Sequence, residues 1–526
     1  MEFKEFIRTW PKQKLINGKS FDDLFQIEGV PFSWFYNRFF LILPAPINTF
    51  KPMEKRRKLT IIEKMKYSLA AKVMTRYIFR NEKKKIKYLR DKNGPKNDTS
   101  DRKKAKKKVL FLTYTNHICQ NGEIFRIHNV LRKIRENGWI GELVLFADPL
   151  SSKNYKKLRD YNSLYNYFDQ DSDKKAKELS ALIFNQWKNL SIRTKKELLT
   201  WERFSLWPYL QYAFEVLFSK QFLYLLVLYY ELFKKIIKEE RIGAIVLTGQ
   251  SSLFDKCAIA AARNTQCPIF RIQHGIGEGV VPPDGSDDIY KLVFSKSVKN
   301  ALINVGWKKE QIIIVGPVIF DPIVSYRNIK KEKEMVIMVA TTASVQSNII
   351  SSKDYFIRIG AIFKSLIEIP RVKLIIKLHP RETPYDKSIQ KYKEILKKLN
   401  FSEKNYQIYP GEITREEFYS LISKSDVFVN FGSAACIEAL LINKPVLNID
   451  IFGNKLITGW AENKKITINL NYDENLKKAV EDVLKPDPDK DLKIKHFLEE
   501  KCGKVDGKAH ERAVKVILKK CLSNLH

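Results

Sequence analysis

The stretch "VFVNFGSAACIEALLINKPVLNID" (residues 427–450) contains a complete strand–helix–strand unit. Its first apolar run stops at Gly432, small residues open a helix, and a second apolar run follows Pro445. Continuous apolar strands that are joined by a helix are typical of parallel sheets covered on both faces. The stretch therefore predicts an α/β fold.

The same alternation extends in both directions along the chain. One series of apolar strands and amphipathic helices begins at residue 109, and a second begins at residue 335 after a charged linker. The pattern predicts two Rossmann-like domains that face each other across a cleft, at 109–328 and 329–526. We expect a helical insertion at about 153–240, closing helices at the end of the chain, and a helical, basic N-terminal extension over 1–108.

Composition excludes several classes of protein. The 526 residues are 44% hydrophobic with 21 Gly and 20 Pro, which is typical of a globular chain. The N-terminus lacks the apolar core of a signal peptide, and the longest clean apolar run, Phe222–Tyr230, is about half the length of a membrane span. The six cysteines are scattered without metal-binding spacing, so we expect reduced thiols and a cytoplasmic protein.

Positive charge is concentrated near the N-terminus. The chain has a formal charge of +35, and residues 51–108 contain 23 basic and 6 acidic side chains. Just upstream, an apolar stripe at helical spacing is formed by Phe32, Phe35, Tyr36, Phe39, Phe40 and Leu43. Residues 31–108 could therefore bind an anionic membrane surface, or the stripe could pack on its own domain. No nucleic-acid recognition motif is present, so specific nucleic-acid binding is not expected.

Three motifs follow predicted strands, where ligands of parallel sheets bind. In "RIQHGIGEG" (271–279), His274 stands at a strand end, and a histidine there can serve as a general base. The loop around it consists of Gln273, Gly275, Gly277 and Glu278. Glycines permit close backbone approach to a ligand, although such loops also occur as simple turns.

The second motif is "KLIIKLHPRE" (373–382). Lys377, His379 and Arg381 alternate with Leu378 and Pro380, so an extended backbone points all three cations the same way. A cation cluster at a strand end suits a phosphate. The alternative is a loop in which the histidine is hydrogen-bonded and its neighbours are solvated.

The third motif is the strand–helix junction at Gly432, Ser433 and Ala434. Small residues leave the first helical N–H groups open to an anion, which the helix dipole also favours. Glu438 follows one turn into the helix and could accept the hydroxyls of a ribose. The alternative is a capped helix with Glu438 in solvent.

Together, the strand-end QHG, the strand-end KLHPR and the G-S-helix-E-KPV segment resemble nucleotide-sugar transferases of the GT-B type. They are similar in particular to the surface-carbohydrate transferases: capsule polysaccharide transferases, CDP-glycerol glycerophosphotransferases, and Kdo- and sialic-acid-type transferases with an HP motif. The resemblance covers about residues 109–520 and includes "GWKKEQIIIVGPVIFDP" (306–322) and "GKVDGKAHERAVKVIL" (503–518). In place of Gln273, the glycerophosphotransferases usually have tryptophan.

The resemblance implies roles for these residues. His274 would act as the base, with its loop on the acceptor side. His379, helped by Lys377 and Arg381, would contact the donor phosphate, while Ser433 and the following amides bind phosphate and Glu438 binds ribose. The donor would be CMP-, CDP- or UDP-linked, with no tightly bound cofactor and no metal, because no DxD-type motif is found.

The sequence thus predicts an enzyme: a cytoplasmic transferase, peripheral on the inner face of the cell membrane, that builds a cell-surface glycan on a glycan or lipid-linked acceptor. Two alternatives remain open. One is an enzyme similar to UDP-N-acetylglucosamine 2-epimerase, which shares the GT-B architecture. The other is a non-catalytic binding protein that retains the fold.

Overall fold

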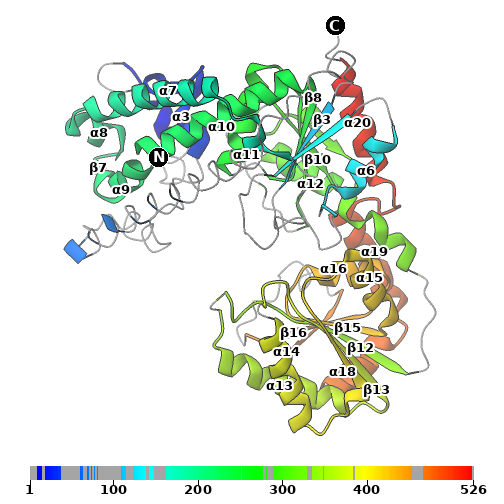
Figure 1. The fold of residues 1–526 in the computed structure, drawn as a ribbon. Coiled ribbons are helices and arrows are strands. Elements are labelled where there is room, and N and C mark those ends of the chain that lie inside the picture. The colour runs from blue at the N-terminus through cyan, green and yellow to red at the C-terminus, as the bar shows by residue number, and fades with distance from the viewer. Residues whose placement is uncertain are drawn as a thin grey trace.

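A computed structural model describes most of the chain. The described residues are 9–14, 18–36, 108–113, 123–124, 126–137, 141–146, 162–249, 252–276, 288–327, 334–347, 349–382, 385–452 and 466–523, with single residues between 60 and 80 and at 280 and 283. Two parallel sheets, each flanked by helices, form two domains, one above the other in Figure 1. The predicted α/β fold with two Rossmann-like domains is confirmed.

The first domain is built on a parallel sheet that begins at residue 108. In spatial order its described strands are β11 (Ile312–Ile314), β10 (Ile289–Val293), β9 (Ile269–Ile272), β8 (Ile242–Leu247), β3 (Lys108–Thr113), β4 (Gly141–Phe146) and β5 (Asn162–Ser163). All six neighbouring pairs are parallel. The carboxyl ends of β3, β8 and β9 therefore meet at one edge of the sheet.

The second domain repeats this architecture. Its strands lie in the order β14 (Tyr406–Tyr409), β13 (Val372–Lys377), β12 (Met335–Ala340), β15 (Val427–Asn430), β16 (Val446–Asp450) and β17 (Ile468–Asn471). In the register of this sheet, Ala340 pairs with both Lys377 and Asn430. The strands that precede two of the predicted motifs therefore end at the same edge of the sheet, on either side of β12.

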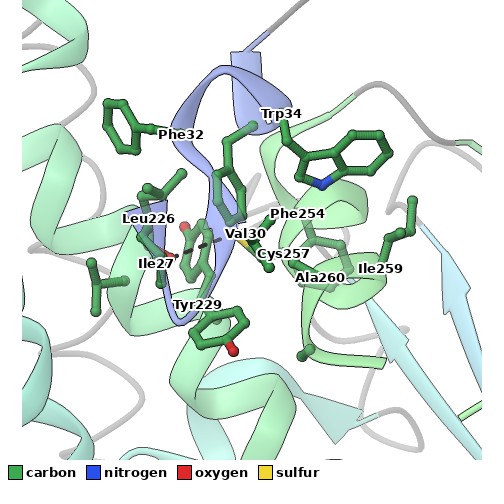
Figure 2. Packing of buried hydrophobic residues seen from close by; sticks show 14 of the residues in the cluster. Ile27, Val30, Phe32, Trp34, Leu226, Tyr229, Phe254, Cys257, Ile259 and Ala260 are labelled. Carbon is green, nitrogen blue, oxygen red and sulfur yellow. Dashed lines mark hydrogen bonds between the residues drawn. The ribbon is translucent and has the colours of Figure 1, made fainter. Parts of the chain in front are cut away.

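The N-terminal segment belongs to the core of the first domain. Phe32 and Phe35 of α3 (Phe32–Tyr36) are 0% and 1% exposed and belong to the same apolar core as residues of α10 (Lys220–Glu239) and α11 (Leu253–Asn264). Figure 2 shows part of this core, including Phe32, Leu226 and Phe254. The Trp34 ring also receives Lys256 Nζ at 3.4 Å from its centroid. Of the two readings of the aromatic stripe, packing on its own domain is the one found for these residues; the side chains of Tyr36, Phe39, Phe40 and Leu43 lie outside the described part of the structure.

The last helix, α20 (Ala509–Ser523), returns to the first domain and packs against α6 (His128–Glu136), beside which it lies in Figure 1. Asp321 in η9 (Val318–Tyr326) fixes its start by accepting hydrogen bonds from the amides of Ala509 and His510, at 2.9 and 2.7 Å. The predicted range 329–526 therefore includes a helix that packs in the core of the other domain.

The helices of the insertion are largely buried. Among the helices that the structure describes, none alone is long and apolar enough to cross a membrane. The pair α9 (Trp207–Leu217) and α10 would meet that test together, but the two helices are bent by 57° and most of their apolar side chains lie in the core. Packing in the core accounts for the apolar character of this segment.

Candidate active site

On the first domain, the loop after β9 is held by Gln273. Its side chain is buried, its Nε2 donates to the Gly275 carbonyl at 3.0 Å, and its Oε1 accepts from the Phe294 amide at 2.9 Å. Both ends of the amide group are thus used to join the loop to the end of β10. Gln273 positions its neighbour His274, while Gly277 and Glu278 of the predicted loop lie outside the described residues.

His274 faces a guanidinium group. Its Nε2 lies 2.5 Å from Nη2 of Arg126, and because guanidinium has only donors, Nε2 accepts this hydrogen bond. The ring also bonds to the backbone of Thr248, at the end of β8. Partial burial, together with the charges of Arg126 and Arg271, lowers the pKa of His274 to about 4. The imidazole is therefore neutral near pH 7, although the residue is exposed on one side.

The backbone of Arg126 has a φ of 76°, in the left-handed region that non-glycine residues rarely adopt. Such strain is frequently found at functional sites. Nothing in the surrounding sequence distinguishes this arginine from the many others in the chain, so no sequence signal predicts its role.

On the second domain, Lys377 is the last residue of β13 and His379 follows it by two residues, so both stand at a strand end as predicted. Lys377 Nζ donates to the Gly411 carbonyl at 2.8 Å, and burial lowers the pKa of Lys377 to about 8. Nδ1 of His379 accepts from the Arg381 amide at 3.1 Å, and burial, with the charges of Lys377 and Arg381, lowers the pKa of His379 to about 4. A neutral ring that accepts at Nδ1 has its proton on Nε2, where it can donate to a phosphate.

A buried carboxylate supports this turn. Glu382 Oε1 accepts from the His379 amide at 2.8 Å and bonds to Thr341 Oγ1, while Oε2 accepts from Tyr392 at 2.8 Å. Burial raises the pKa of Glu382. The turn also requires a glycine opposite, because a Cβ on Gly411 would stand 2.5 Å from the His379 carbonyl oxygen.

Glu438 on α16 (Ala435–Leu441) is ion-paired and largely buried rather than in solvent. Its Oε1 accepts from Arg415 Nη1 at 2.6 Å, and the two side chains are 12% and 21% exposed. The same nitrogen donates to Tyr419 at 2.6 Å. Glu438 also raises the pKa of Lys377 against the effect of burial, so it lies within the cation cluster. A ribose would have to use its other oxygen or displace Arg415.

The junction between β15 and α16 is more closed than predicted. Gly432 has a φ of 80°, which explains the glycine. The Ser433 amide donates to Asn430 Oδ1 at 3.1 Å, and the Ala435 amide donates to Ser433 Oγ at 3.3 Å. The helix begins at Ala435, two residues after Ser433, with Ala434 as its N-cap. These amides have acceptors within the chain, so a phosphate would compete with them.

The two domains face each other across a cavity. It is lined by Glu123, Ile124, Arg126, His128 and Asn129 of the first domain, by Val318, Ile319 and Pro322 of η9, and by Arg415 and Glu416 of the second domain. Burial, and then the charge of Arg415, lowers the pKa of Arg126 to about 9, so the two guanidinium groups interact. They connect the His274 loop on one wall to the Glu438 and Lys377 cluster on the other. Within the described residues, no three His, Cys, Asp or Glu side chains are grouped closely enough to hold a metal ion.

No protein-family model and no curated protein matches this chain. Among solved structures, it is similar to Staphylococcus aureus MnaA in complex with UDP (15% identity, TM-score 0.46, 80% of this chain and 98% of that one). It is also similar to UDP-GlcNAc 2-epimerase from Neisseria meningitidis bound to UDP-GlcNAc (12%, 0.47, 80% and 100%) and to MurG from Acinetobacter baumannii (12%, 0.42, 78% and 99%). Likenesses this distant leave the function to be inferred from the chain's own residues.

Proposed function

We propose that the chain is a nucleotide-sugar-dependent transferase of the GT-B type. It would move a sugar or polyol phosphate from a CMP-, CDP- or UDP-linked donor to a growing cell-surface polysaccharide or a lipid-linked acceptor. The observation that supports this most directly is the joint arrangement of both walls. On one wall of the interdomain cavity Arg126 contacts the neutral His274, and on the other wall Arg415 pairs with Glu438, whose charge acts on Lys377.

The second domain would hold the donor phosphate. Lys377 and Arg381 supply positive charge, and His379 Nε2–H donates a hydrogen bond without adding a charge. Lys377 and His379 are held by contacts within the protein, because Glu382, Gly411 and the Arg381 amide fix the turn. Cations arranged in advance around a leaving phosphate stabilise the negative charge that develops there.

The first domain would bind the acceptor. The hydroxyl oxygen of the acceptor would attack the anomeric carbon of the donor sugar, or the phosphorus in a polyol phosphate transfer. The proton of that hydroxyl would pass to His274 Nε2. The bond to the leaving nucleotide breaks, and its electron pair remains on the phosphate oxygen. Arg126 occupies that nitrogen in the present structure, so it has to turn away before His274 can accept a proton.

The test is a thermal-shift titration of the whole chain with UDP, GDP, CDP and CMP. A ligand at a hundred times its Kd stabilises the protein by about 2.7 kcal/mol. His379→Ala should weaken binding of the stabilising nucleotide by about tenfold to a hundredfold, the usual effect of a hydrogen bond to a charged group. His496→Ala is the matched control, because His496 is exposed on α19 (Pro488–Cys502) of the same region.

A shift with one nucleotide, reduced in His379→Ala alone, would support the donor site and identify the donor class. No shift with any of the four would contradict the transferase and favour a non-catalytic protein. Equal loss in both variants would mean that His379 does not contact the nucleotide.

A second candidate is an enzyme similar to UDP-GlcNAc 2-epimerase, because the interdomain cavity has one carboxylate on each wall, Glu123 and Glu416. Inversion at a sugar carbon requires one group to remove a proton and another to return one to the opposite face. Incubation with UDP-GlcNAc in D2O, without acceptor, separates the two functions. An epimerase would incorporate deuterium at C2 of the sugar, and a transferase would not.

A further inference from the structure

Exposed apolar side chains at helical positions precede the first domain. Ile61, Met65, Leu69 and Val73 are each four residues apart and helical, and they are 76%, 68%, 65% and 59% exposed. Ile62 beside them is 66% exposed. Residues four apart lie on the same face of a helix, so the row forms one continuous stripe. We call these five side chains the exposed stripe.

The exposed stripe is distinct from the aromatic stripe between Phe32 and Leu43. Phe32 and Phe35 are buried in the core, whereas the exposed stripe keeps more than half of each side chain in contact with solvent. Isolated apolar residues on a surface are ordinary, but a contiguous row on one face marks an interaction site. The exposure of these apolar side chains together on one face therefore requires an explanation.

Charge indicates what kind of partner the exposed stripe fits. It lies within residues 51–108, which contain 23 basic and 6 acidic residues. Arg76 and Arg80, which also stand at helical positions, are exposed as well. A partner must therefore offer both apolar contact and negative charge.

We propose that the exposed stripe and the basic residues around it bind an anionic lipid bilayer. The apolar side chains would enter the hydrocarbon boundary while Lys and Arg contact the headgroups, each contributing to attraction at the surface. A second copy of this chain fits less well, because each copy has a formal charge of +35 and the two would repel each other. Nucleic acid would satisfy the charge but leaves the apolar row in water.

The proposal does not depend on the proposed function, because vesicle binding is measured without a donor or an acceptor. The experiment is co-sedimentation of the whole chain with sucrose-loaded vesicles of phosphatidylcholine, with and without 30% phosphatidylserine. Met65→Glu with Leu69→Glu is the test variant. Ile357→Glu with Leu492→Glu is the matched control, because these apolar residues are 59% and 54% exposed on the second domain.

We expect the wild type to bind the phosphatidylserine vesicles, to bind pure phosphatidylcholine far less, and to be released by salt. The test variant should lose on the order of a hundredfold in its partition coefficient, since two apolar contacts are removed and two negative charges are added. The control should bind like the wild type.

An equal loss of vesicle binding in the test and control variants would overturn the proposal. So would vesicle binding that does not depend on phosphatidylserine. It would also be overturned if sedimentation equilibrium showed a wild-type dimer that the test variant abolishes while vesicle binding is unchanged. Retention of vesicle binding by the test variant, with loss of binding to single-stranded DNA, would instead assign the exposed stripe to nucleic acid.

Discussion

Replacing Arg126 with glutamine should raise the pKa of His274 from about 4. The sign follows from the contact between Arg126 Nη2 and His274 Nε2, 2.5 Å apart. A cation at that distance disfavours the protonated imidazolium, and the hydrogen bond that it donates stabilises the neutral ring. Glutamine removes the charge, so the ring should take up a proton at a higher pH.

The size of the change follows from the distance and the exposure of the site. Two unit charges about 4 Å apart interact by about 1 kcal/mol in water and about 4 kcal/mol at an effective dielectric constant of 20. Because His274 is exposed on one side, the smaller figure applies. Since 1.36 kcal/mol corresponds to one pKa unit, the pKa of His274 should rise by roughly 1.

The assay is a titration of the imidazole NMR signals of the whole chain, labelled at histidine. The chain has seven histidines, so the signal of His274 is assigned by its loss in His274→Gln. Arg132→Gln is the control, because Arg132 is on α6 with 61% of its side chain exposed. It changes the net charge equally at a more solvated position, and the pKa of His274 should stay where it is in the wild type.

Two results would refute this reasoning. If His274 of the wild type titrates near 6.5, the ring is not held neutral by its surroundings. If its pKa is about 4 but Arg126→Gln leaves it unchanged, then burial and Arg271 account for the depression and Arg126 does not control the base.

Three further predictions concern stability, each measured by urea denaturation. Gly411→Ala should lower the free energy of unfolding by about 1–3 kcal/mol, because the new Cβ would meet the His379 carbonyl. Gly360→Ala is the control: Gly360 lies within α13 (Ser352–Ile367), and a Cβ there would be 3.8 Å from Ile395, so this change should be neutral or stabilising by up to about 1 kcal/mol. Glu438→Ala should cost about 1–3 kcal/mol by leaving the partly buried Arg415 without its carboxylate, and Glu438→Leu with Arg415→Met should recover most of it. The free energy of unfolding should fall as pH is lowered from about 6.5 to about 4, because His274 and His379 bind protons at a higher pH in the unfolded chain than in the folded one. Replacing both histidines with glutamine should make the free energy of unfolding less dependent on pH in this range.

The fold could be predicted because its signals are local. The inner strands of the second sheet are short, largely apolar runs, and β15 is buried at all four positions, so a parallel sheet is visible in the sequence itself. The edge strand β17, with the sequence INLN, lacks that signal. The same logic placed Lys377 and His379 at a strand end, where the structure has them. Exact helix starts are less visible: Asn430, through its bond to the Ser433 amide, extends the turn before α16, and that depends on a side chain in the preceding strand.

The rest of the site could not be predicted, because it depends on contacts between distant segments. Arg126 and Arg415 belong to segments without a strand-end signal, and they become neighbours only when the domains meet. Glu382 is the last residue of the quoted HPRE stretch, but only burial beside Thr341 and Tyr392 distinguishes it as a support for His379. In the same way, Phe32 has the spacing of a membrane-binding stripe, and only the presence of α10 and α11 makes it core.

The meeting of Arg126 and Arg415 has a consequence for ligand binding. Two guanidinium groups on opposite walls of a cavity repel each other, and the repulsion is part of what lowers the pKa of Arg126 to about 9. An anion between them replaces one repulsion with two attractions, and it draws Arg126 from His274 Nε2 at the same time. Binding of an anion between Arg126 and Arg415 would therefore hold the two walls together and also free His274 Nε2. If the chain is the proposed transferase, binding of a phosphate-bearing donor and activation of His274 would be one step rather than two. Arg126→Gln should then separate them, because it leaves His274 accessible in the absence of any ligand.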